Sequence, residues 1–105
     1  MIKIDKSKEG EIYNHMTAMT VIHVVLIRDF ISADLEIRKS AITFIEKELE
    51  DIPSDDIRID FSDVKSITPE FARQYLTSKR RSKKEIHEVN LPLHVELIIK
   101  KAQKY

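Results

Sequence analysis

The segment IRIDFSDVKSITPEFARQYL, residues 57–76, places a strand pattern directly before a helix start. Ile57, Ile59 and Phe61 alternate with polar side chains, which is typical of a β-strand. Thr68 is a favourable N-cap, and the proline and glutamate that follow it suit the first positions of a helix. A strand followed so closely by a helix predicts one unit of an α/β fold.

The same alternation of strand and helix patterns continues on both sides of this segment. Apolar or β-branched runs predict the further strands, and spacings of three and four predict the further helices. We expect a short edge strand at Ile2–Ile4, a buried strand at Met19–Ile27, a helix from Ser32 or Asp34 to about Glu50, a strand at Glu85–Val89, and a last helix after Pro92 with Leu93, Val95, Leu97, Ile98 and Ala102 turned inward.

The order of these elements, β-β-α-β-α-β-α, predicts the fold class. Strands that alternate with helices form a parallel or mixed sheet with helical crossovers. We therefore expect an α/β fold with a four-stranded mixed sheet and about three helices. With 105 residues, the chain is long enough for one core, so we expect a single domain over residues 1–105.

Composition argues against most catalytic and metal-binding chemistry. The chain has no cysteine and a single glycine, Gly10, which excludes thiolate sites and a glycine-rich phosphate loop. Its four histidines lack the spacing of a metal site, and His23 suits a core or interface position in its strand. We expect no enzyme, no metal and no cofactor. A charged N-terminus and short apolar runs predict a cytoplasmic protein.

Three short motifs carry a resemblance to a known family. DFSDV at residues 60–64, TPEFA at residues 68–72 and VNLP at residues 89–92 follow one another in the predicted strand-loop-helix-strand order. Together they resemble STAS domains, the sulfate-transporter and anti-sigma-factor-antagonist superfamily, and above all a STAS-like family of unknown function. Its members read roughly DFSGV and then SPSFA, so Asp63 stands here for the glycine. The resemblance covers about residues 32 to 105.

This resemblance implies a regulatory role. In anti-sigma-factor antagonists, a kinase-like ATPase phosphorylates a serine before the helix, and the phosphorylation state selects the partner. The matching position here is Pro69, which has no hydroxyl, while Glu70 supplies a permanent negative charge beside it. The resemblance thus implies a docking module that is not phosphorylated at the family's serine, with a kinase-like ATPase or another signalling protein as its partner.

The partner surface would comprise the loop at residues 62–70 and the polar face of the following helix. Phe71 and Tyr75 would face the core. The residues that we expect on this surface are Ser62, Ser66, Thr68, Glu70, Arg73 and Gln74. A second interpretation stays open, in which Thr68 to Phe71 form a helix cap and nothing more.

Nucleic-acid binding is the alternative function. Clustered cations neutralise phosphates, and the basic residues near the end of the same helix are Lys79, Arg80, Arg81, Lys83 and Lys84. Against this alternative stand a net charge of zero and a content of three Tyr, four Phe and no Trp, most of which the core requires. The sequence leaves open the oligomeric state and a purely structural role in a larger complex.

Overall fold

The computed structural model describes residues 21–104, and these residues form five strands and four α-helices. Helix α2 continues directly into one short π-helical segment, η1. In chain order the elements are β1 Ile22–Leu26, α1 Ile27–Phe30, β2 Asp34–Leu35, α2 Arg38–Thr43, η1 Phe44–Glu48, β3 Asp56–Asp60, β4 Ser66–Ile67, α3 Pro69–Arg81, β5 Glu85–Val89 and α4 Leu93–Gln103.

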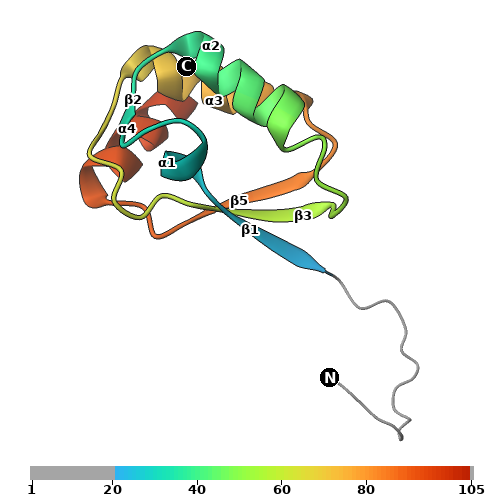
Figure 1. Cartoon of the computed structure of the whole chain (residues 1–105). Helices are drawn as coiled ribbons and strands as arrows, with labels where there is room; N and C mark the ends of the chain where they lie inside the picture. The colour runs from blue at the N-terminus through green and yellow to red at the C-terminus, as the bar shows by residue number, and fades with distance from the viewer. Residues whose placement is uncertain (1–20, 105) are drawn as a thin grey trace, which may run out of the picture.

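The strands form two separate parallel sheets. One sheet has the order β1-β3-β5 (Figure 1), and the other joins β2 to β4. The α/β class is confirmed, but the expected single four-stranded mixed sheet is wrong for residues 21–104. Strands β2 and β4 were missed because two residues are too short to show an alternating pattern. The strand expected at Ile2–Ile4 lies outside the described residues.

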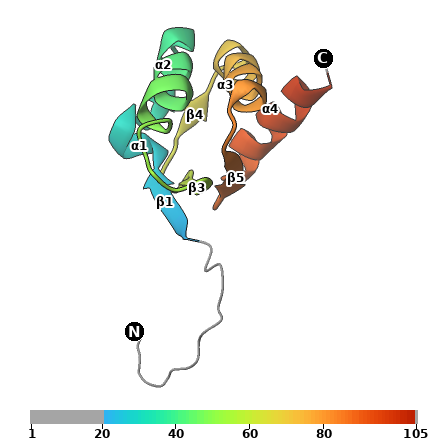
Figure 2. The ribbon, with the colours of Figure 1, turned by 90° about the vertical axis from the view of Figure 1, so that its right-hand side faces the viewer.

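The core lies between the larger sheet and the helices α2, α3 and α4, which all cover the same face of that sheet (Figures 1 and 2). Val25, Ile57, Ile59 and Ile86 point from the three strands into this core. Aromatic rings meet them from Phe61, directly after β3, and from Tyr75 of α3, and these two rings pack edge to face with centroids 5.9 Å apart.

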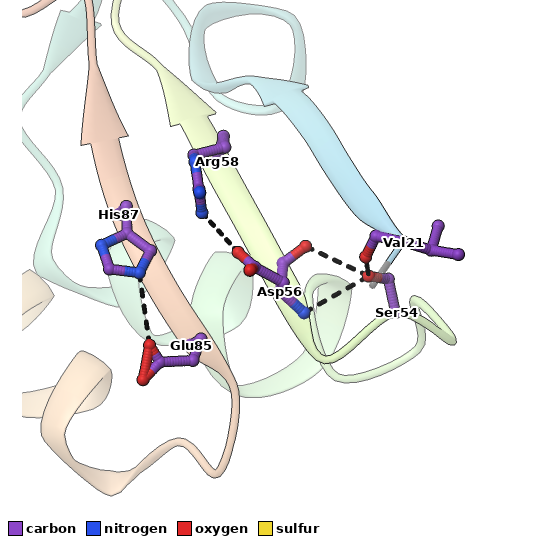
Figure 3. Close-up of polar contacts among 6 residues, drawn as sticks. All are labelled: Val21, Ser54, Asp56, Arg58, Glu85 and His87. Carbon is purple, nitrogen blue, oxygen red and sulfur yellow. Dashed lines mark hydrogen bonds and ion pairs between the residues drawn. The ribbon is translucent and has the colours of Figure 1, made fainter. Parts of the chain in front are cut away.

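The other face of the sheet is more exposed within residues 21–104. Ile22 and Val24 of β1 are 48% and 56% exposed. On the neighbouring strands, Arg58 pairs with Asp56 and His87 with Glu85, as Figure 3 shows. The expectation of a buried strand at Met19–Ile27 is therefore wrong for the first part of β1, where His23 is exposed as well, and Ile27 already belongs to α1. Residues 19–20 of that expectation lie outside the described residues. The apolar run could not reveal that β1 would be an edge strand with only one face covered.

The helix boundaries are partly as expected. Helix α3 follows Thr68, β5 spans Glu85–Val89 and α4 begins directly after Pro92, which confirms three predicted elements. Helix α2 begins only at Arg38, not at Ser32 or Asp34. The Ser32 hydroxyl accepts a bond from the Asp34 N–H at 2.9 Å and forms a local turn, after which β2 pairs with β4.

Candidate functional site

The start of α3 is fixed by two hydroxyl groups. Thr68 Oγ1 accepts a hydrogen bond from the Phe71 N–H at 3.1 Å, which is an N-cap, and donates to the Glu36 carbonyl at 3.3 Å. Ser66 Oγ donates to Asp34 Oδ1 at 2.7 Å. The strand pair β2–β4 thus joins the segment before α2 to the segment before α3, and the expected N-cap role of Thr68 is confirmed.

Ser62 belongs to a separate polar cluster at the carboxyl ends of β3 and β5. Asp60 Oδ1 accepts bonds from the Ser62 hydroxyl at 2.6 Å, from the Ser62 N–H at 2.8 Å and from the Asn90 amide at 3.3 Å. The bond from the Ser62 hydroxyl is the main cause that lowers the pKa of Asp60. Asp63 and Asn90 nearby have φ angles of 63° and 54°, in the left-handed region.

Glu70 and Arg73 lie on the exposed side of α3, as expected. Their side chains are 61% and 53% exposed, and the Arg73 guanidinium lies 3.7 Å from the Glu70 carboxylate. Because both groups reach solvent, this ion pair contributes little to stability and its members remain available to a partner.

Gln74 lies elsewhere, although the sequence pattern suggested the outer face of α3. It is only 9% exposed and lies between α3 and α2. Its Oε1 accepts a 3.2 Å bond from Arg38, and its Nε2 donates to Ser78 Oγ at 3.2 Å. Ser78 in turn donates to Glu46 at 2.6 Å. Gln74 therefore links α3 to α2. Its position on α3 faces the neighbouring helix although the side chain is polar.

The basic residues 79–84 divide into two groups. Lys79 lies 2.7 Å from the Glu88 carboxylate, and Lys84 Nζ donates to the carbonyls of Ile52 and Ser54 at 2.7 Å and 2.9 Å. Arg81 lies 3.9 Å from Glu46. Among residues 21–104, Arg80 and Lys83 make no ion pair or side-chain hydrogen bond, and both are exposed. Two of these cations therefore hold parts of the fold together.

A groove between α3 and α4 was not expected from the sequence. It has a volume of about 510 Å³ and is lined by Pro69, Arg73, Ile98, Lys101 and Ala102. No single sequence motif predicts this groove, because its walls come from two helices. The sequence of α4 does carry a signal for an exposed apolar surface, because its apolar residues occupy more positions than one buried stripe requires.

Other site types have little support in the described part of the chain. Residues 21–104 contain no group of three His, Asp or Glu side chains arranged to hold a metal ion. Their longest helix is both too short and too polar to cross a membrane.

Comparisons with known proteins add no relative. No protein-family model, curated protein or solved structure matches this chain significantly.

Proposed function

We propose that this chain is a non-catalytic regulatory module of the STAS-like kind that docks onto a cytoplasmic signalling protein, such as a kinase-like ATPase. The docking surface comprises the loop at residues 62–70 and the exposed side of α3. The observation that carries this proposal is the start of α3, where Pro69 occupies the first helical position and the Glu70 carboxylate stands exposed beside it.

A carboxylate at a helix start carries a fixed negative charge where a regulatory phosphate would carry a removable one. A phosphate at a helix start interacts favourably with the helix dipole and attracts basic groups of a partner. Glu70 offers one negative charge there that no enzyme adds or removes. The proposed module would thus hold one binding state constantly.

The geometry of the preceding loop also supports the STAS-like resemblance. Asp63 stands where the family motif has glycine, and its φ of 63° lies in the region that glycine adopts most easily. A left-handed residue at this position is compatible with a loop of the same shape as one that has glycine there. Asp63 fits because aspartate tolerates the left-handed region better than most residues.

Hydroxyl groups near the start of α3 are poor substitutes for the family's serine. Thr68 Oγ1 accepts the Phe71 N–H, and Ser66 Oγ donates to Asp34. A phosphate on either group would disturb the helix cap or place its charge beside a carboxylate. Nucleic-acid binding gains no support either, because Lys79 and Lys84 already contact protein acceptors.

The test exchanges the charge at the helix start and leaves the cap intact. The wild-type chain, Glu70→Gln and Glu70→Lys are used to capture the partner from native lysate, and affinity for the captured partner is then measured. We expect Glu70→Lys to weaken binding at least about tenfold, because a repulsion replaces an attraction.

Glu48→Lys is the matched control. Glu48 is exposed on η1, and this substitution changes the net charge by the same amount as Glu70→Lys. Circular dichroism must show that all variants keep their fold. Equal affinity in wild type and Glu70→Lys would refute docking at this surface.

A further inference from the structure

The groove between α3 and α4 has an apolar floor between charged walls. Ile98 and Ala102 of α4 and the ring of Pro69 provide the apolar part. Arg73 stands on the α3 side, and Lys101 stands on the α4 side. Figure 2 shows these two helices side by side on one face of the sheet.

The charge of the groove walls is predominantly positive. The charge of Arg73 is partly offset by Glu70 at 3.7 Å, whereas Lys101 forms no ion pair with any residue between 21 and 104. Arg80 follows Arg73 by seven residues, so it lies on the same side of α3 about 10 Å farther along the helix axis. Beyond the groove itself, positive charge on this side of α3 therefore continues for nearly two helical turns.

Exposed apolar side chains precede the wall residue Lys101 along α4. Leu93 and Leu97 were expected in the core but are 70% and 58% exposed. Leu97 precedes Lys101 by one turn, so on the surface of α4 it neighbours that residue of the groove wall. An apolar strip beside cations is complementary to a ligand that has an apolar stripe flanked by acidic groups.

We propose that this groove binds an acidic amphipathic helix of a protein partner. Leucine-like side chains of that helix would lie on Ile98, Ala102 and Leu97, as in other helix-in-groove complexes. Its carboxylates would pair with Arg73 and Lys101, and a further one, about two turns on, with Arg80. This inference rests on the proposed docking function and specifies the chemistry of the partner, which would present a basic group to Glu70 and a separate acidic helix to the groove.

The test uses the full chain and fluorescent designed peptides. One peptide is helical, with leucines at positions i, i+3, i+4 and i+7 and glutamates beside them. In a second peptide every glutamate is lysine, and the third probe is an oligothymidylate. Fluorescence anisotropy near physiological salt should show binding of the acidic peptide only.

Variants then locate the binding site. Arg73→Glu and Lys101→Glu should each weaken the acidic peptide at least about tenfold, because each reverses one wall charge. Leu97→Ala should weaken it several-fold without loss of the fold, since this side chain is largely exposed. Lys83→Glu changes the net charge equally, lies outside the groove and should leave affinity unchanged.

Several results would overturn the proposal. These are undetectable binding of the acidic peptide, equal binding of the lysine peptide, tighter binding of oligothymidylate, or an equal loss in Lys83→Glu and Lys101→Glu. If Glu70→Lys loses the native partner while Lys101→Glu retains it, docking stands and the groove is refuted. If Glu70→Lys retains that partner while the acidic peptide needs Lys101, the groove stands and the proposed docking surface is refuted.

Discussion

The hydroxyl of Tyr75 donates a 2.5 Å hydrogen bond to the carboxylate of Glu88, which joins α3 to β5 from inside the core. Lys79 contacts the same carboxylate oxygen at 2.7 Å. Burial, and then the negative charge of Glu88, raise the pKa of Tyr75 well above its ordinary value.

This pKa shift predicts a loss of stability in alkali. Below about pH 10, Tyr75 is protonated in both the folded and the unfolded chain, so its contribution is fully present. Above that pH the unfolded chain releases the proton and the folded chain keeps it, so the free energy of unfolding falls by up to about 1.4 kcal/mol per pH unit. In urea unfolding measured against pH, Tyr75→Phe should show a shallower alkaline decline. Parallel profiles for both proteins would contradict the raised pKa.

Substitutions of Ile59 and Val24 compare how much the two faces of the larger sheet contribute to stability. Ile59 is fully buried against the helices, whereas Val24 on the neighbouring strand is 56% exposed on the opposite face. Ile59→Ala should lower the free energy of unfolding by about 2 to 5 kcal/mol, through lost burial and a cavity. Val24→Ala should change it by less than about 1 kcal/mol. Denaturant unfolding measures both, and equal losses would mean that the exposed face is covered in solution.

Thr68→Ala should destabilise the chain by about 0.5 to 2 kcal/mol, because the Phe71 N–H loses its side-chain acceptor. Thr68→Ser keeps the hydroxyl oxygen and should recover most of that loss. Thermal unfolding of the two variants beside the wild type gives the comparison. If alanine and serine were equally costly, the methyl group of Thr68 would matter more than its oxygen.

Replacing Lys84 should cost more stability than replacing Lys83, although the two lysines are adjacent in the sequence. Lys84→Met removes a charged donor from the carbonyls of Ile52 and Ser54 and should cost about 1 to 3 kcal/mol. Lys83→Met should fall within about 0.5 kcal/mol of the wild type, as is common for exposed sites. A urea midpoint for each variant decides, and indistinguishable midpoints would show that Lys84 is not a structural residue.

Local signals in the sequence predicted some elements well. Helix α3 could be located because Thr68 and Pro69 carry the chemistry of a helix start within adjacent residues. Strand β3 alternates clearly, since one side packs against helices and the other bears Arg58 and Asp56. These features depend on short stretches of chain.

Features that depend on distant partners were not predicted. Leu35 is buried because β2 pairs with β4, 32 residues away, and this pairing also displaces the start of α2. Gln74 looks like an outward residue until Arg38 and Ser78 are placed around it. Leu93 and Leu97 fit a core pattern, yet the core is already filled by Val95 and Ile99 of the same helix.

The contact between Ser66 and Asp34 has a mechanical consequence. The stretches that lead into α2 and α3 are hydrogen-bonded to one another, so we expect a restraint on one helix start to restrain the other. A ligand that stiffens the beginning of α3 would thus slow amide hydrogen exchange at the beginning of α2 as well, although it touches only one of them. The two helix starts would then respond together to a ligand bound at only one of them.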